Sequence, residues 1–406
     1  MFIYKAAVIG GGTMGAGIAQ VISYSGLPVI LKEANDELAQ KALSKIKAIY
    51  QARVDKGKMT PGDLEAKMSL VGVTSGNEVL KDADLVIEAV PEKMELKKKI
   101  FKELDGLLPS QSILASNTSA LSISELAAAT KRPDKVVGVH FFYPAHVMKL
   151  VEVIPGLATS EETTADAIAF CESLRKIPIR VNECAGFLVN RLLMPYLNEA
   201  AFAAEEGSAS LRDIDKAMVE FGFPMGPFVL VDTIGLDICH EVVGVLLEEY
   251  GNRMKPASLW EEIYKLGRYG VKSGAGFYNY GQEAKDDKAV VEILNQTGAK
   301  RGATKAPFSP ERLLLAMINE AALCIQEKIA SPSDIDMALL AGIGFPQSKG
   351  GLLQYADEMG IDAALTKLNS LYRVYGERFF PAPLLKRMVR AGFLGKKAKR
   401  GFLEYV

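Results

Sequence analysis

The chain has 406 residues, of which 49% are hydrophobic and 24% are charged, and these ordinary proportions exclude a disordered, collagen-like or coiled-coil protein. At roughly 100 to 200 residues per domain, this length predicts two or three domains. The 48 Lys and Arg residues balance the 49 Asp and Glu residues, so the net charge of −1 provides no basic field that would favour nucleic acid as a partner.

The N-terminal residues run from Met1 directly into an apolar strand pattern, without the apolar core and cleavage site of a signal peptide. No stretch approaches the roughly 18 consecutive apolar residues of a membrane span. The cysteines lie far apart without a C-x-x-C pair. The sequence therefore indicates no disulfide framework and no site for zinc or another metal. We therefore expect a soluble, cytoplasmic protein without a metal or a membrane partner.

Residues 4–182 alternate short runs rich in Val and Ile with longer segments of helical period, a pattern typical of a parallel α/β sheet. Each short run is too apolar for a surface strand. The predicted strands are Lys5–Ile9, Pro28–Lys32, Asp84–Ala89, Ser112–Ala115, Lys135–Phe142, Lys149–Ile154 and Ile177–Val181. After Cys184 the strand pattern ends, and one long helix is predicted from Gly186 to Glu206.

A G-x-G-x-x-G motif, residues 10–15, follows the first predicted strand and opens a helix that runs to about Ser25. Its first glycine permits a tight turn, its second lets the backbone approach a pyrophosphate, and its third lets helix and strand pack closely. Glu33 ends the next strand, 23 residues beyond Gly10, where an acid binds the adenosine ribose and repels a 2′-phosphate. We therefore predict a doubly wound, Rossmann-type domain over residues 1–182 that binds NAD rather than NADP. A glycine turn beside an incidental surface acid is the alternative. The predicted cofactor residues here are Gly10, Gly12, Thr13, Met14, Gly15 and Glu33.

His140 is the one histidine of the three in the sequence that lies at the end of a buried strand run. Ligands bind at such strand ends in open α/β sheets. The next apolar run, Lys149–Ile154, contains a single acid, Glu152, which needs a partner because burying an unpaired charge is costly. Imidazole has a suitable pKa to act as the base when NAD oxidises a secondary alcohol, so we interpret His140 as the base and Glu152 as the carboxylate that orients it. A core histidine and a structural acid form the alternative.

The helical region after residue 183 contains an internal repeat, with an offset that grows from 121 to 125 residues. Residues 198–201 recur as 319–322, 213–215 as 334–336, 222–224 as 344–346, and 276–277 as 401–402. Two copies of one helical fold, at 183–281 and 300–406, fit this pattern better than a solenoid, which needs about three or more shorter units. The stretch from Gly281 to Lys305 is polar and linker-like.

Motifs spread along nearly the whole chain match one family pattern. They are Val8–Gly15, Asp84–Glu92, Ser116–Ser119, His140–Pro144 with Met148–Glu152, Gly186–Arg191, Gly222–Pro227 and Gly274–Tyr278. In these motifs the chain resembles the 3-hydroxyacyl-CoA dehydrogenase family of fatty-acid β-oxidation. Tyr143 departs from the asparagine that is usual there, but it follows the histidine without replacing it. The resemblance implies an NAD-dependent enzyme that oxidises an (S)-3-hydroxyacyl-CoA thioester to 3-ketoacyl-CoA.

The resemblance also implies catalytic roles. His140 would be the base, Glu152 its partner, and Ser119 and Asn190 would hydrogen-bond the substrate oxygen or the histidine. Asn190 lies near the start of the long predicted helix, so the helical region would close the active site from the other side of a cleft.

On the cofactor side, Glu92 and Lys97 match a pair in the family, and Asn117 would reach the nicotinamide. Each residue also has a plain structural interpretation. Glu92 and Lys97 would be an ion pair on a helix surface, and Asn117 and Ser119 would cap a helix from Leu121 to Ala129.

Two other functions remain open from the sequence. A related dehydrogenase of sugar acids, of the gulonate type, would act on free hydroxy acids and not on thioesters. A non-catalytic structural protein that binds NAD is the second alternative, and the intact set of Ser119, His140, Glu152 and Asn190 argues against it.

The second helical copy has Glu311 where the first has Asn190, and the sheet occurs only once, so this copy cannot build a second active site. In family members with one helical domain, that domain forms a symmetric dimer interface. We therefore expect the two copies to bury their apolar faces on each other, as in such a dimer, and the chain to be a monomer.

Overall fold

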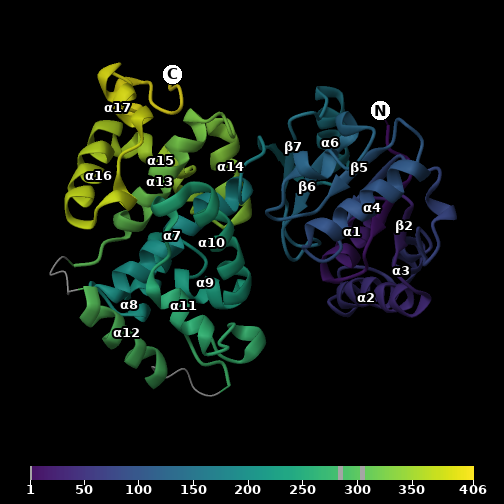
Figure 1. Cartoon of the computed structure of the whole chain (residues 1–406), viewed down its shortest axis with the longest axis horizontal. Helices are drawn as coiled ribbons and strands as arrows, with labels where there is room; N and C mark the ends of the chain where they lie inside the picture. The colour runs from purple at the N-terminus through teal and green to yellow at the C-terminus, as the bar shows by residue number, and fades with distance from the viewer. Residues whose placement is uncertain (1, 282–286, 302–306) are drawn as a thin grey trace. The chain divides into compact units, whose positions relative to one another are not determined.

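The computed structural model describes residues 2–281, 287–301 and 307–406, and for residues 298–301 it describes the backbone alone. The chain forms two compact units, Met1–Phe187 and Leu188–Val406. We call them the sheet unit and the helical unit. Figure 1 shows that the N-terminus belongs to the sheet unit and the C-terminus to the helical unit.

The sheet unit contains one eight-stranded sheet with the order β3-β2-β1-β4-β5-β6-β7-β8. Its strands are β1 (Ala6–Ile9), β2 (Val29–Lys32), β3 (Val71–Thr74), β4 (Leu85–Glu88), β5 (Ile113–Ser116), β6 (Val136–Phe141), β7 (Leu150–Pro155) and β8 (Ile177–Arg180). Strands β1 to β6 are mutually parallel. The predicted α/β class is therefore confirmed.

Three details of the sheet differ from the sequence prediction. Strand β7 is antiparallel to β6, because the short connection between them leaves no room for the crossover helix that a parallel pair needs. Strand β3 was not predicted, since this short, partly exposed edge strand lacks a continuous apolar run. The prediction that every strand is fully covered was wrong for β8, where Arg180 is exposed at the other edge of the sheet.

Helices connect the strands and cover their apolar side chains. They are α1 (Thr13–Tyr24), α2 (Asp36–Asp55), α3 (Pro61–Met68), α4 (Met94–Leu107), α5 (Ile123–Ala127) and α6 (Glu161–Ser173). Ile18 and Ile22 of α1 join Val8, Leu31 and Ile87 of the sheet in one buried core. Because β1, β4, β5 and β6 are parallel, their carboxyl ends lie along one edge of the sheet. The buried core holds them there.

The helical unit consists of α7 (Phe187–Glu205), α8 (Leu211–Phe221), α9 (Pro227–Ile234), α10 (Leu236–Tyr250), α11 (Ser258–Lys265), α12 (Lys288–Arg301), α13 (Pro310–Gln326), α14 (Pro332–Gly342), α15 (Leu352–Met359), α16 (Ile361–Tyr375) and α17 (Pro383–Arg390). Helices α7 to α11 form the first copy of the repeat, and α13 to α17 form the second.

Buried aspartates show that the two copies repeat the same tertiary contacts. Asp215 accepts a hydrogen bond from the backbone N–H of Phe228 at 2.9 Å, and its counterpart Asp336 accepts one from Leu353 at 2.7 Å. Asp232 and Asp357 accept equivalent bonds from the backbone N–H groups of residues 277 and 402. The predicted internal duplication is confirmed.

Part of the predicted linker is a helix. Helix α12 occupies residues 288–301 and packs against α11, with Val290 only 2% exposed. Its few apolar residues are at helical spacing among many polar ones, so the polar composition of the segment suggested a linker. The rest of that prediction, at residues 282–286 and 302–305, lies outside the described residues.

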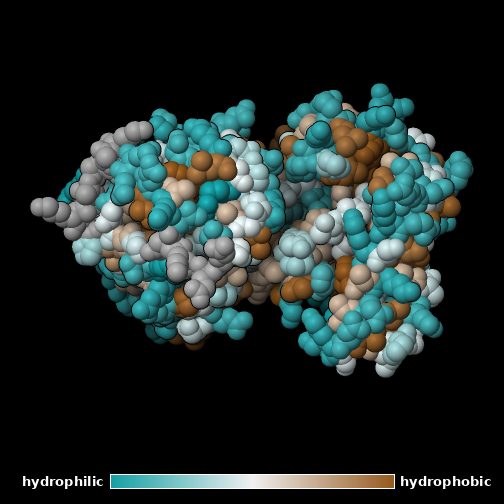
Figure 2. Space-filling model, turned by 90° about the horizontal axis from the view of Figure 1, so that it is seen from below, coloured by the Kyte–Doolittle hydropathy of each residue, from teal (hydrophilic) through white to brown (hydrophobic). Residues whose placement is uncertain are grey.

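Hydrophilic side chains cover most of the face of each unit seen in Figure 2, with hydrophobic ones between them. Every helix among residues 2–281, 287–301 and 307–406 is too short or too polar to cross a lipid bilayer.

Candidate active site

The glycine-rich turn joins β1 to α1 in a conformation that side chains would block. Gly10 has φ +98°, and a Cβ on it would lie 2.8 Å from the carbonyl oxygen of Ala89. A Cβ on Gly15 would lie 1.8 Å from the carbonyl oxygen of Gly10, so helix and strand pack as closely as predicted. Gly12, by contrast, faces open space. The backbone beside Gly12 can therefore be approached by a ligand, and a phosphate at this helix N-terminus would meet exposed N–H groups.

Thr13 and Met14 form the first turn of α1, where Thr13 is exposed and Met14 is half-buried. No side chain caps this helix, which leaves its N-terminal end to the glycine turn. Both residues lie where the prediction places them, and their contact with a cofactor stays a prediction.

Glu33 lies just past the end of β2 and holds the glycine turn from the neighbouring strand. One carboxylate oxygen, Oε1, accepts a hydrogen bond from the N–H of Gly11 at 2.5 Å, and Oε2 accepts one from Ala34 at 3.0 Å. Lys45 of α2 donates to the carbonyl oxygen of Gly11 at 3.2 Å. The acid is thus fixed beside the turn, as a ribose-binding residue must be.

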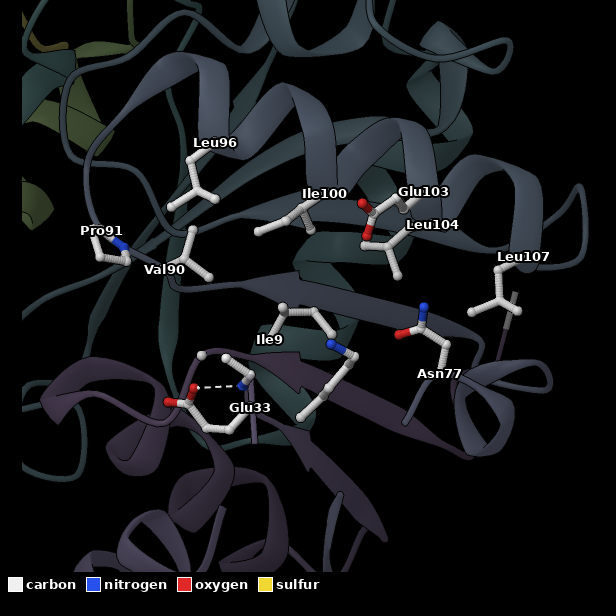
Figure 3. Close-up of a pocket in the computed structure, with 13 residues that line it drawn as sticks. Ile9, Glu33, Asn77, Val90, Pro91, Leu96, Ile100, Glu103, Leu104 and Leu107 are labelled. Atoms are coloured by element: carbon white, nitrogen blue, oxygen red, sulfur yellow. Dashed lines mark hydrogen bonds between the residues drawn. The ribbon is translucent and has the colours of Figure 1, made fainter. Parts of the chain in front are cut away.

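A cavity of about 240 Å³ opens beside Glu33. Figure 3 shows aliphatic side chains of α4 on one side of it and Ile9, Val90 and Glu33 on the other. The remaining lining residues include Gly10, Lys32, Ala34, Asn77, Pro91, Leu96, Ile100, Glu103, Leu104 and Leu107. An apolar slot that ends at an acid suits an adenosine group, whose flat base is apolar and whose ribose carries hydroxyls.

The predicted catalytic pair is formed by direct neighbours across the antiparallel β6–β7 ladder, His140 and Glu152. The imidazole Nδ1 lies 2.8 Å from Oε2 of Glu152. His140 is 6% exposed and Glu152 is fully buried, and the rings of Phe142 and Phe187 lie against the imidazole. A carboxylate at Nδ1 favours the tautomer with its proton there, which leaves the lone pair of Nε2 to accept a proton.

The other two histidines lack this arrangement. His146 lies in the loop after β6, where desolvation by the surrounding protein and the charge of Lys176 lower the pKa of its imidazole. His240 stacks on Tyr264 and lies 2.9 Å from the exposed Glu261. His140 is therefore the histidine that the described structure equips with a buried acid.

The loop after β5 carries Asn117 and Ser119. The side-chain oxygen of Asn117 accepts a hydrogen bond from the N–H of Phe141 at 2.8 Å, which ties this loop to the residue after His140. The backbone N–H of Ser119 donates to Oε1 of Glu92 at 2.9 Å. The helix-cap alternative was wrong for both residues, because helix α5 begins at Ile123 and Ser122 caps it.

Glu92 and Lys97 do form an ion pair, but the surface alternative was wrong for Lys97, while Glu92 is exposed just before α4. Lys97 is only 1% exposed, and its Nζ lies 2.7 Å from Glu88 and 3.1 Å from Glu92. Sequence reasoning missed Glu88, a fully buried acid at the end of β4. The signal was present, since an acid inside an apolar run is what singled out Glu152.

Asn190 lies in the first turn of α7, in the helical unit, so its predicted catalytic role stays a prediction. The part of the chain that the structure describes holds no cluster of three or more His, Cys, Asp or Glu side chains suited to a metal ion.

Comparison with known families matches this geometry. Residues 5–184 match the NAD-binding domain of 3-hydroxyacyl-CoA dehydrogenase, and residues 186–280 and 308–405 match its C-terminal domain. The chain belongs to the 3-hydroxyacyl-CoA dehydrogenase family. The two matched C-terminal segments coincide with the two helical copies.

Individual relatives agree with the family. The fatty acid oxidation complex subunit alpha of Shewanella amazonensis is 40% identical over 394 residues, which is 96% of this chain and 56% of that protein. The chain thus spans about half the length of the curated relatives that it matches. The structure of 3-hydroxybutyryl-CoA dehydrogenase from Escherichia coli K12 superposes with a TM-score of 0.88 at 31% identity, covering 96% of this chain and 99% of that one.

A shorter relative aligns with only part of this chain. The (S)-3-hydroxybutyryl-CoA dehydrogenase of Ralstonia eutropha is 40% identical, with a TM-score of 0.67, and the whole of that protein covers 69% of this chain.

Proposed function

We propose that the chain catalyses the NAD-dependent oxidation of (S)-3-hydroxyacyl-CoA thioesters to 3-ketoacyl-CoA, or the reverse reduction. The buried His140–Glu152 pair carries this proposal. It lies near the carboxyl end of β6, on the sheet edge where β1 leads into the glycine turn, because β1 and β6 run parallel. A base and a dinucleotide turn on one edge are the two parts that such a reaction requires.

The residues present fit NAD. The open backbone at Gly12 and the start of α1 would hold the pyrophosphate, and the cavity with Glu33 would hold the adenosine. The negative charge of Glu33 would repel the 2′-phosphate of NADP. When bound, NAD accepts the hydride that leaves C3 of the substrate.

His140 would take the hydroxyl proton at Nε2 as the C3 carbonyl forms. Glu152 would keep the ring in the required tautomer and stabilise the imidazolium, since its carboxylate lies 2.8 Å from Nδ1. A positioned base of this kind contributes about 10² to 10⁴ in rate. We propose that Ser119 and Asn190 hydrogen-bond the substrate oxygen, that Asn117 lies on the nicotinamide side, and that Glu92 and Lys97 form the cofactor-side pair.

The test is an NADH-oxidation assay with acetoacetyl-CoA, longer 3-ketoacyl-CoA thioesters and dicarboxylic ones, run beside a panel of free keto acids. Turnover of thioesters with NADH preferred over NADPH is expected. Activity on free acids and none on thioesters would support a gulonate-type dehydrogenase and contradict the proposal. NADH binding without turnover of either class would indicate a non-catalytic protein.

We also propose that the helical unit comprises two domains, 183–281 and 300–406, that form an internal pseudo-dimer, and that the chain is a monomer. Reciprocal contacts between the copies support this proposal. Arg191 donates to Glu320 at 2.8 Å, and its counterpart Arg312 donates to Glu199 at 2.6 Å. Such an exchange between equivalent residues is the signature of a two-fold interface.

Light scattering should give the chain mass of 44.0 kDa, and twice that mass would refute the monomer. A chain truncated before Lys305 should expose the apolar face of the first copy and dimerise or aggregate. A fully active truncated monomer would contradict the pseudo-dimer.

A further inference from the structure

The catalytic proposal leaves one buried acid of the sheet unit without a role. Glu88 ends β4 and is fully buried. Its Oε1 accepts hydrogen bonds from the N–H of Val90 and from Nζ of Lys97, both at 2.7 Å. Its Oε2 accepts one from Oγ of Ser116, also at 2.7 Å. A carboxylate with three donors is held rigidly at the edge of the sheet where the site lies.

Lys97 extends this contact toward Ser119. Its ammonium lies between Glu88 and Glu92, at 2.7 and 3.1 Å. Glu92 in turn accepts the backbone N–H of Ser119 at 2.9 Å and the hydroxyl of Thr118. A series of charge-assisted contacts therefore runs from Glu88 to the backbone of Ser119.

A second series of hydrogen bonds connects Glu88 to the same loop through Ser116 and through the backbone of Asn117. Oγ of Ser116 accepts the N–H of Thr118 at 3.3 Å while donating to Glu88. The backbone N–H of Asn117 donates to the carbonyl oxygen of Glu88 at 2.8 Å. Asn117 then accepts the N–H of Phe141, the residue after His140. Each residue from 116 to 119 is thus tied to Glu88 directly or through one or two partners.

The free energy of a buried ion pair does not by itself explain why this cluster is present. Burying a carboxylate and an ammonium costs several kcal/mol of desolvation each by order of magnitude, and a buried ion pair is often no more stable than a well-packed apolar pair. What the pair does provide is fixed geometry for the loop that carries two residues of the proposed site.

We propose that Glu88 is a positioning residue for the dehydrogenase reaction. Through Lys97 and Glu92, and through Ser116, it holds residues 116–119 where Asn117 and Ser119 meet the reacting groups. This inference rests on the proposed function and adds to it a residue that touches neither substrate nor cofactor.

Glu88→Gln tests the proposal, because it keeps the size of the side chain and removes its charge. We expect kcat for acetoacetyl-CoA reduction, counted per NADH-binding site, to fall about 10- to 100-fold, since small displacements of reacting groups have effects of this size. The Kd for NADH, from fluorescence titration, should change less than about fivefold. Amide exchange in a peptide covering residues 116–120 should become faster.

Glu95→Gln is the matched control. Glu95 is on the same helix as Lys97 and pairs with Lys98 at 3.1 Å, but its side chain is 87% exposed. It should leave kcat and amide exchange unchanged. A Glu88→Gln enzyme whose kcat per NADH-binding site and loop exchange both match the wild type would reduce Glu88 to a structural residue and overturn the inference.

Ser116→Ala provides a second route if Glu88→Gln fails to fold. It removes one bond to Glu88 and one to Thr118 without leaving a buried charge unpaired. Faster exchange at 116–120 with a several-fold lower kcat supports the proposal, and wild-type values of both contradict it. If the wild type itself reduces no thioester, the proposed function fails, while amide exchange still reports whether Glu88 orders the loop.

Discussion

Both units bury charged side chains, but they do so in different patterns. In the sheet unit the carboxyl ends of parallel strands carry His140 and Glu88. Each of them pairs with a buried residue of opposite character, Glu152 and Lys97 respectively. In the helical unit Arg191, Arg312 and their glutamate partners exchange contacts between the two copies of the repeat. The comparison shows that burial of charge alone does not mark a catalytic site. We propose that its place in the topology, and whether the duplicate copy repeats it, separates residues that serve the reaction from residues that hold the copies together.

The first way to break this comparison is to remove the imidazole. His140→Gln should lower kcat at least about 10³-fold with little change in NADH affinity, because the base and its orientation are both lost. His240→Gln in the helical unit is the matched control and should retain full activity, since that ring stacks on Tyr264 near the surface. Near-normal turnover of His140→Gln would remove the catalytic assignment.

A second test breaks the contacts between the copies. Arg312→Met should lower the free energy of unfolding by about 3 kcal/mol or more, because Glu199 and Glu206 each lose a buried partner. Arg373→Met, at an exposed position of α16, should cost less than about 0.5 kcal/mol. Denaturant titrations measure both. If Arg312→Met were as stable as Arg373→Met, the reciprocal pairs would not hold the copies together.

A third test uses pH to reveal the repeated aspartates. Burial raises the pKa of Asp215 and of Asp336 from 3.8 to about 6. The folded helical unit therefore binds more protons than the unfolded chain between pH 4 and 6, and these groups lower its stability as pH rises through that window. By order of magnitude, each aspartate should lower the stability by about 3 kcal/mol across this window, because one pKa unit corresponds to about 1.4 kcal/mol.

Urea titrations between pH 4 and 7 would measure this slope, and Asp215→Asn with Asp336→Asn should flatten it. An unchanged slope in that double variant would assign the pH dependence to other groups.

The smallest expected effect concerns cofactor choice in the sheet unit. Glu33→Ala should weaken NADH binding about 10-fold, since hydrogen bonds to a charged group are lost. It should also relax the discrimination against NADPH, because Lys32 and Lys45 remain near the turn. Titrations with both cofactors give the ratio of the two dissociation constants. If this ratio is the same in Glu33→Ala and in the wild type, Glu33 does not select the cofactor and only supports the glycine turn.

The sequence was sufficient for the features that depend on local pattern. The glycine turn, the strand runs and the repeat are periodic or motif-based, and an acid in an apolar run pointed to Glu152. The same signal at Glu88 was present in Leu85-Val86-Ile87-Glu88 but was not used.

Other features depend on contacts between distant residues. The structural interpretation of Glu92 and Lys97 placed them on the surface of a helix, but only the packing of α4 shows that Lys97 is buried. The repeat revealed that Arg191 and Arg312 are equivalent, whereas their exchange of partners requires the folded helical unit. β3 went unpredicted because its partner strand, and not its own composition, makes it a strand.

We propose that the buried His140–Glu152 pair of the sheet unit serves chemistry, whereas the buried arginine–glutamate pairs of the helical unit hold its two copies together. One paired measurement tests it most directly: kcat and the free energy of unfolding for Glu152→Gln and Glu320→Gln, each of which neutralises one buried glutamate. Glu152→Gln should lower kcat by about 10² or more with a small change in stability. Glu320→Gln should lose about 3 kcal/mol of stability and keep its kcat, because Arg191 and Arg253 lose their shared partner. Loss of activity in Glu320→Gln with an active Glu152→Gln would contradict it.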